Sequence, residues 1–107
     1  MTLTIYGIKT CDTCRKALKS LVEAEFHDVR TTPLSADERA RFLAAFGDSL
    51  INRASTTWRN LSEAERADSA DTLLAQYPTL MKRPVIQKGD ALYLGWKADV
   101  QQALGVL

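Results

Sequence analysis

The hydrophobic pattern of the first thirty residues changes from the period of a strand to that of a helix. Residues 3–7 combine β-branched and aromatic side chains and end at a glycine, which is typical of a short strand. Residues 26–29 have the composition of a second one. Between them, apolar positions recur at helical spacing, at Cys14, Ala17, Leu18, Leu21 and Val22. This pattern predicts a β-α-β unit, whose two strands are parallel.

The middle of the chain, residues 31–79, has only helical signals. A Ser-x-x-Glu capping box at residues 35–38 predicts a helix that runs to about residue 46, where a glycine follows. A second box at residues 62–65 predicts an alanine-rich helix to about residue 76, stopped by a Tyr-Pro pair. Residues 51–58 are expected to form a short helix between the two.

Strand character returns only near the C-terminus. Residues 84–87 and 91–94 predict two strands, and Lys-Gly-Asp at 88–90 is a hairpin turn. A final helix is expected to bury Trp96, Val100, Ala103, Leu104 and Leu107. The whole pattern predicts an α/β fold with a four-stranded mixed sheet. We expect one domain, residues 1–107, with a core formed by 1–30 and 80–107 and an all-helical insert at 31–79.

Two cysteines, the only ones in the chain, stand where the first strand leads into the first helix. The first turn of a helix offers N–H groups without intrahelical partners and a partial positive charge, and both favour a thiolate over a thiol. Cys11 is expected at the helix cap and accessible, whereas Cys14 falls on the apolar stripe and is expected to be covered. We therefore interpret Cys11 as the attacking thiol and Cys14 as the resolving thiol. Asp12 opposes thiolate formation unless its side chain turns to solvent.

Three other interpretations of the cysteine pair compete with a redox role. A structural disulfide across so short a loop stabilises by only about 2 kcal/mol in the chain-entropy model. A zinc site normally needs four Cys or His ligands, and His27 is the only histidine. Two unrelated core cysteines in one helix remain an open alternative. A redox pair is favoured, with no metal.

Composition sets the broad class of the protein. A chain of 107 residues, 46% hydrophobic and 25% charged, fits one globular domain. The net charge of +1, with no polybasic tail, gives no support for nucleic-acid binding. No apolar stretch reaches the length needed to span a bilayer, and no signal peptide precedes the first strand. We therefore expect a cytoplasmic monomer that does not bind membranes.

The order of the elements, with Cys-x-x-Cys after the first strand, resembles a thioredoxin fold that carries a helical insertion. This resemblance implies that Pro84, at the start of the third strand, forms a cis peptide bond with Arg83 and faces the cysteines.

Four strings resemble the arsenate reductase (ArsC) family, and most closely its YffB-like branch. They are residues 6–14 (YGIKTCDTC), 55–59 (STTWR), 82–85 (KRPV) and 94–96 (LGW). The resemblance implies a nucleophile at Cys11 and arginines at Arg15, Arg53 and Arg83 that neutralise a thiolate or hold an anion. Lys9, Thr10 and Val85 complete the expected substrate-binding set.

Two departures from the family pattern bear on the reaction. Arsenate-reducing members usually carry a further arginine after the cis-proline, but between Pro84 and Gly95 this chain has only Lys88. Many members also lack a cysteine at the position of Cys14 and depend on an external thiol. The first departure argues against arsenate as the substrate, and the second implies that the resolving thiol is built into the chain.

We therefore expect a glutathione-linked thiol-disulfide oxidoreductase without a bound cofactor. Its partners would be glutathione or a reductant of the thioredoxin or glutaredoxin type, and possible substrates include protein disulfides. Two alternatives stay open. One is a redox-sensing regulator that resembles Spx and binds RNA polymerase, and the other is an arsenate reductase.

Overall fold

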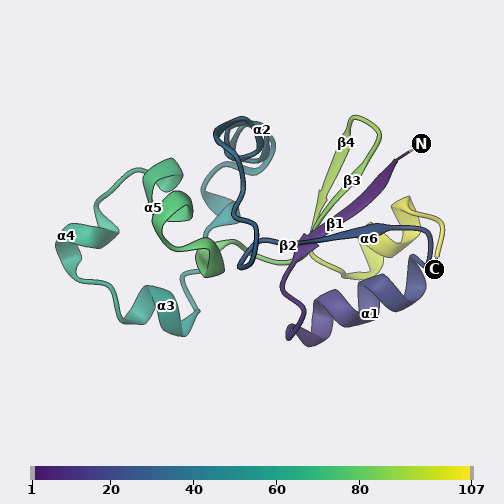
Figure 1. Cartoon of the computed structure of the whole chain (residues 1–107), viewed down its shortest axis with the longest axis horizontal. Helices are drawn as coiled ribbons and strands as arrows, with labels where there is room; N and C mark the ends of the chain where they lie inside the picture. Colours follow the sequence, from purple (N-terminus) through teal and green to yellow (C-terminus); the bar gives the residue numbers. More distant parts are fainter. Residues whose placement is uncertain (1, 107) are drawn as a thin grey trace. The chain divides into compact units, whose positions relative to one another are not determined.

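The computed structural model describes residues 2–106, which fall into two compact units (Figure 1). Residues 2–29 and 83–106 form the first, here called the sheet unit. Arg30–Lys82 forms the second, the helical unit. The sheet unit is thus built from the two ends of the chain, and the helical unit from its middle.

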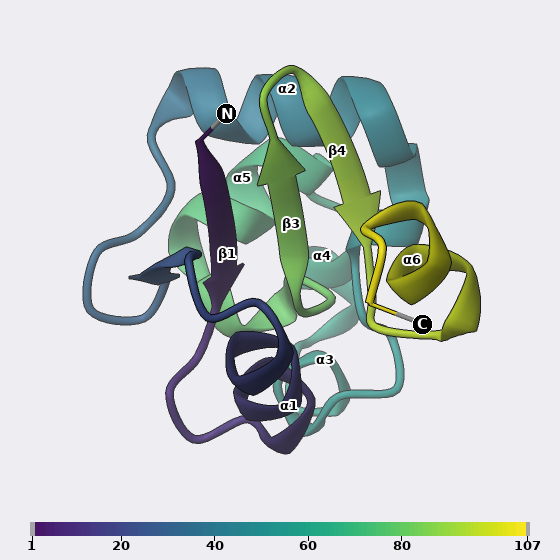
Figure 2. The ribbon, with the colours of Figure 1, turned by 90° about the vertical axis from the view of Figure 1, so that its right-hand side faces the viewer.

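The sheet unit contains one four-stranded sheet in the order β2-β1-β3-β4 (Figure 2). Its elements are β1 (Leu3–Gly7), α1 (Asp12–Ser20), β2 (Glu25–Asp28), β3 (Val85–Lys88), β4 (Ala91–Leu94) and α6 (Ala98–Ala103). The β1–β2 pair is parallel, and the β1–β3 and β3–β4 pairs are antiparallel. The predicted mixed sheet is therefore confirmed, with β1 in its interior.

The helical unit consists of short helices joined by tight turns. They are α2 (Ala36–Phe46), η1 (Gly47–Leu50), α3 (Thr56–Arg59), α4 (Glu63–Arg66), α5 (Ala70–Gln76) and η2 (Pro78–Leu80). Both predicted capping boxes are present. In the first, the Glu38 N–H donates to Ser35 Oγ at 3.1 Å, and the Ser35 N–H donates to Glu38 Oε1 at 2.8 Å.

Two helix predictions in this unit were wrong in extent. The helix expected from the second box to residue 76 is two helices, because Ser69 caps a new one by accepting the Thr72 N–H at 3.2 Å. The helix expected at residues 51–58 begins only after Ser55, since Ile51 instead forms a β-bridge with Met81. A serine that can accept a backbone N–H ends one helix and starts the next.

We expect the substitution Ser35→Ala to lower the free energy of unfolding by about 1 kcal/mol, because it removes the side-chain oxygen that accepts the Glu38 N–H at the start of α2. Chemical denaturation of the two proteins measures the difference. Ser49→Ala, at an exposed serine that caps no helix, is the control and should change stability by less than about 0.5 kcal/mol. Equal losses in the two variants would contradict a role for the cap.

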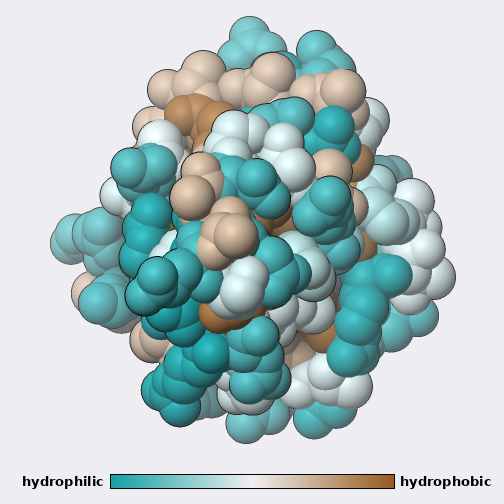
Figure 3. All heavy atoms as spheres, turned by 90° about the vertical axis from the view of Figure 1, so that its left-hand side faces the viewer, coloured by the Kyte–Doolittle hydropathy of each residue, from teal (hydrophilic) through white to brown (hydrophobic). Residues whose placement is uncertain are grey.

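The molecular face drawn in Figure 3 is mainly hydrophilic, and its apolar atoms lie in small separate patches. Within residues 2–106, no helix is both long and apolar enough to cross a bilayer.

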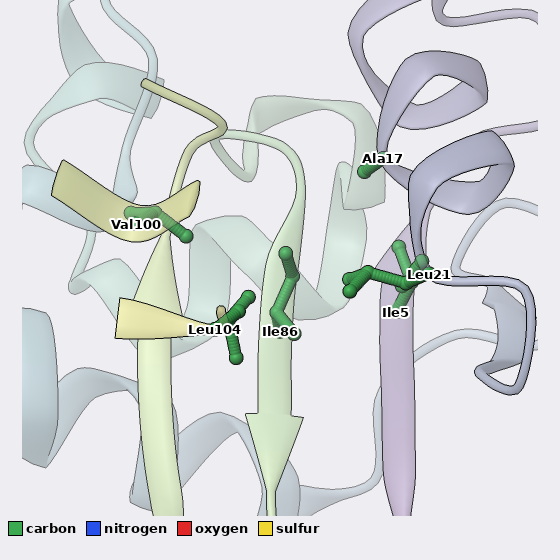
Figure 4. Close-up of a cluster of buried hydrophobic side chains, with 6 residues drawn as sticks. All are labelled: Ile5, Ala17, Leu21, Ile86, Val100 and Leu104. Atoms are coloured by element: carbon green, nitrogen blue, oxygen red, sulfur yellow. The ribbon is translucent and has the colours of Figure 1, made fainter. Parts of the chain in front are cut away.

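The helices α1 and α6 pack on the same face of the sheet and enclose one apolar cluster (Figure 4). The strands contribute Ile5 and Ile86, and the helical segments contribute Ala17, Leu21, Val100 and Leu104. Each large side chain in the cluster contributes about 1.5–3 kcal/mol through burial. This cluster fixes the position of α1 and therefore of the cysteines at its N-terminus.

Several helices and strands of the sheet unit begin or end at other residues than the sequence pattern predicted. Helix α1 ends at Ser20, so Val22 lies beyond it and is 82% exposed. Leu18 is also at the surface, because Cys14, Ala17 and Leu21 occupy the line that faces the sheet. Strand β2 is one residue earlier than expected.

The last helix is also shorter than expected. Val100 of α6 and Leu104, the residue that follows the helix, are buried as predicted, but Ala103 is exposed. The predicted burial of Leu107 concerns a position outside the described residues.

Candidate functional site

Cys11 is the N-cap residue of α1, as its position in the sequence predicted. Its backbone is extended, with φ −82° and ψ 121°, and its carbonyl accepts the Arg15 N–H at 3.0 Å. Its own N–H donates to the Ile8 carbonyl at 3.0 Å and so holds the preceding turn. The side chain is partly exposed. Its sulfur therefore stands at the positive end of the helix and within reach of a solute.

Cys14 lies one turn further along α1 and is fully buried, with 0% of its surface exposed. The sulfur rests against the backbone of Gly7, at the end of β1. Both thiols are free in this structure. The predicted contrast between an accessible and a covered cysteine is confirmed.

The environment moves the pKa values of the two thiols in opposite directions. At Cys11, desolvation is the largest single influence and raises the pKa. It is outweighed by hydrogen bonds from the Cys14 N–H, the Cys14 thiol and Arg83, and by the charge of Arg83, so the pKa is lowered. At Cys14, burial together with the neighbouring Cys11 raises the pKa to about 12. Cys11 is thus the thiol that ionises first.

Arg83 and Pro84 come directly before β3, the strand next to β1. The peptide bond between them is cis, as predicted. The Pro84 carbonyl accepts the Gly95 N–H at 2.8 Å, and Val85 pairs with Tyr6 of β1. These bonds fix the backbone from which the Arg83 side chain reaches Cys11.

The loop before Cys11 carries exposed Lys9 and Thr10. The Lys9 N–H donates to Asp28 Oδ2 at 3.1 Å, and the Lys9 carbonyl accepts a hydrogen bond from Arg15 Nε at 2.9 Å. Arg15 also forms an ion pair with Asp12 at 3.8 Å. Because the Asp12 side chain is 88% exposed, water screens its effect on the thiolate.

Arg53 belongs to the helical unit. Its guanidinium lies over the Trp58 ring, 5.2 Å from the centroid, and Nη1 donates to the Asp48 carbonyl at 3.4 Å. It lines a surface pocket of about 420 Å³ with Lys82. The structure therefore brings Cys11, Cys14 and Arg83 together within the sheet unit. Arg53 belongs to the helical unit, where Asp48 and Lys82 also line its pocket.

Two features of these surroundings were not predicted. The guanidinium of Arg66 also lies over the Trp58 ring, 5.4 Å from its centroid. Arg66 donates hydrogen bonds to the carbonyls of Trp58 and Arg59 as well. The contact between Gly7 and Cys14 was also missed. A glycine in a strand is a general signal that another group approaches closely. In the sequence pattern, Gly7 indicated only the end of the strand. Within residues 2–106, no three His, Cys, Asp or Glu side chains are grouped so as to hold a metal ion.

Comparison with known proteins found a matching family and similar proteins over nearly the whole chain. The model of the ArsC family matches residues 6–104. An uncharacterized protein of Haemophilus influenzae is 40% identical over 110 residues, covering 94% of this chain and 96% of that protein. A solved structure described as the YFFB protein is 36% identical, with a TM-score of 0.85, covering 95% of this chain and 97% of that one.

A relative of another functional class was also found. The global transcriptional regulator Spx of Streptococcus pyogenes is 29% identical over 107 residues, covering 91% of this chain and 80% of the regulator. The similarity therefore extends over nearly the whole chain in each comparison.

Proposed function

Since the chain belongs to the ArsC family, we propose that it is a glutathione-linked thiol-disulfide oxidoreductase in which Cys11 attacks and Cys14 resolves. The observation that carries the proposal is the contrast between the two thiols. The accessible one has a lowered pKa and the buried one a raised pKa. A thiolate, and not a thiol, attacks disulfides.

The reaction has two exchange steps. In the first, the Cys11 thiolate attacks one sulfur of a substrate disulfide, the S–S bond breaks, and the leaving thiolate takes a proton from the medium. In the second, Cys14 loses its proton and attacks Cys11 Sγ in the mixed disulfide, which releases the other substrate thiol. The substrate gains two electrons, and the two cysteines lose them as they form the Cys11–Cys14 disulfide.

Regeneration needs two electrons from outside the chain. Two molecules of glutathione supply them and leave as glutathione disulfide, or the dithiol of a thioredoxin- or glutaredoxin-type protein does so. No bound cofactor takes part. Every protein group in this scheme comes from one chain, so a monomer is sufficient.

The high pKa of Cys14 supports the order of these steps. Part of its elevation comes from Cys11, both from the hydrogen bond and from the negative charge of the thiolate. When Cys11 enters a mixed disulfide that charge disappears, and the pKa of Cys14 falls. Cys14 is therefore a poor nucleophile before the first step and a better one after it.

The remaining residues are proposed to support the nucleophile or to bind the substrate. Arg83 stabilises the Cys11 thiolate. Pro84 and Val85, expected to belong to the site, are fully buried and paired within the sheet, so their proposed role is to hold the backbone that carries Arg83. Lys9, Thr10 and Arg15 stand around the nucleophile, where a cation can pair with a carboxylate of glutathione. Arg53 is proposed to hold an anionic group in the pocket of the helical unit.

The proposal is tested by the pH dependence of iodoacetamide alkylation, with Cys11 and Cys14 resolved by mass spectrometry. We expect Cys11 to react with a midpoint below the free-cysteine value of about 8.5, because its pKa is lowered. Cys14 should stay nearly unreactive up to about pH 9, because its pKa is raised to about 12. With glutathione disulfide, the native chain should end as the Cys11–Cys14 disulfide, and the Cys14→Ser variant should keep the glutathionyl group on Cys11. A Cys11 midpoint at or above the free value would contradict the proposal.

A regulator is the second candidate, because the match to Spx covers most of both chains. In that case the cysteine pair would sense oxidation and the chain would bind RNA polymerase. A pull-down from lysate with the reduced and the oxidised protein decides between them. Recovery of polymerase subunits in one redox state only would favour the regulator.

Arsenate reduction is supported by the family alone. The Lys88 side chain at the end of β3 is the only cation between Pro84 and Gly95, and it is exposed. An assay of arsenate-dependent NADPH oxidation with glutathione and glutaredoxin tests this activity, and we expect no detectable rate.

A further inference from the structure

Gly7 is the last residue of β1, and its α-carbon faces the buried sulfur of Cys14. A Cβ atom built at Gly7 would collide with Cys14 Sγ and would lie 3.2 Å from Cys14 Cβ. The next atom, Cε1 of Phe26, would be an ordinary 3.7 Å away. Gly7 is not among the glycines with positive φ, so its backbone does not require glycine. The space that the missing side chain leaves is therefore occupied by one group, the Cys14 thiol.

Neither β1, which carries Gly7, nor α1, which carries Cys14, can shift freely to relieve this contact. On the strand side, Gly7 pairs with Asp28 of β2, and its carbonyl accepts the Val29 N–H at 2.9 Å. On the helix side, Ala17 and Leu21 hold α1 in the apolar cluster with Ile5. A side chain at position 7 would therefore displace the sulfur by rotation about the Cys14 Cα–Cβ bond, because this rotation costs less than shifting a packed element. The 3.2 Å approach to Cys14 Cβ, which the rotation does not relieve, requires a further shift of only a few tenths of an ångström.

We propose that Gly7 is a positioning residue that keeps the Cys14 thiol buried, so that an incoming substrate reacts with Cys11 and not with Cys14. The inference rests on the proposed division of roles between the two thiols. Burial of the Cys14 thiol acts in two ways. It keeps reagents away from the sulfur, and it keeps the thiol protonated. A displaced sulfur would lose both forms of protection and would compete with Cys11 for reagents.

The access of Cys14 is measured in the Cys11→Ser protein, in which no second thiol competes and no disulfide forms. Alkylation of Cys14 by iodoacetamide is followed across pH with Gly7 present and with Gly7→Ala. We expect Gly7→Ala to raise the rate at about pH 8 by about tenfold or more, since each unit by which the Cys14 pKa falls raises the thiolate fraction about tenfold. An unchanged rate and pH profile would overturn the inference.

A second measurement separates this role from a general need for glycine in the strand. Gly7→Ala is introduced into the native chain and into the Cys14→Ala variant, and thermal unfolding is compared. With Cys14 present we expect Tm to fall by more than about 5 °C. In the Cys14→Ala background the sulfur is absent, and most of that loss should disappear.

An equal fall in Tm in the two backgrounds would show that glycine is needed at position 7 by the strand itself and not by the Cys14 thiol. If Gly7→Ala folds only when Cys14 is absent, the inference is supported in its strongest form. If it folds in neither, the inference fails. None of these readouts requires turnover, so an inactive protein would refute the proposed function and leave the placement of Cys14 to be judged separately.

Discussion

The substitution Cys11→Ser should abolish turnover of disulfide substrates, with a loss on the order of a thousandfold or more. A serine hydroxyl keeps the geometry of the helix cap, but it does not ionise at neutral pH and forms no disulfide. Reduction of a small mixed disulfide by glutathione, followed through NADPH oxidation in the presence of glutathione reductase, measures the effect.

Cys14→Ser is the matched control for this experiment. It keeps the nucleophile but removes the resolving thiol, so we expect a stable adduct in which Cys11 is joined to the substrate. Mass spectrometry of the unreduced protein detects the adduct. Turnover that survives in the Cys11→Ser protein would show that the chemistry does not pass through this residue.

Removal of the Arg83 charge is the second large effect that we expect. In Arg83→Gln the Cys11 thiolate loses both a hydrogen bond and a favourable charge, so the pKa of Cys11 rises. The thiolate fraction at about pH 7 then falls, and the attack rate should fall by roughly tenfold, a value limited by the partial exposure of the sulfur to water.

The pH profile separates this explanation from simple damage to the site. Above the pKa values of both proteins the variant should match or exceed the native rate, because a more basic thiolate is intrinsically more nucleophilic. Lys16→Gln removes an exposed charge from the same helix as Cys11 and should leave the alkylation midpoint unchanged. A profile of Arg83→Gln that is lowered equally at every pH would contradict the assigned role.

Local signals in the sequence were enough to predict most of the secondary structure. The box at Ser35 and the glycine after Phe46 bound α2 as predicted, because a cap satisfies its backbone groups within a few residues. The errors arose where two local signals compete. A serine such as Ser69 can continue a helix or cap one, and in this structure it caps α5. Periodicity likewise could not place the end of α1 before Val22.

The candidate site was predictable in part for the same reason. The accessible Cys11 and the buried Cys14 follow from the position of the pair at the start of a helix. The approach of Arg83 to Cys11 joins residues far apart in the chain, and only the family resemblance suggested it. The contact between Gly7 and Cys14 needs the crossing geometry of β1 and α1, which no sequence period contains.

The place of β1 between β2 and β3 has a consequence for synthesis of the chain. The ribosome delivers β1, Cys11 and β2 first, whereas Arg83 and β3 follow only after the whole of Arg30–Lys82 has been translated. On the nascent chain Cys11 therefore lacks the cation that favours its thiolate. The part of the lowered Cys11 pKa that comes from Arg83 can arise only after the strand that follows Arg83 has been made and has paired with β1.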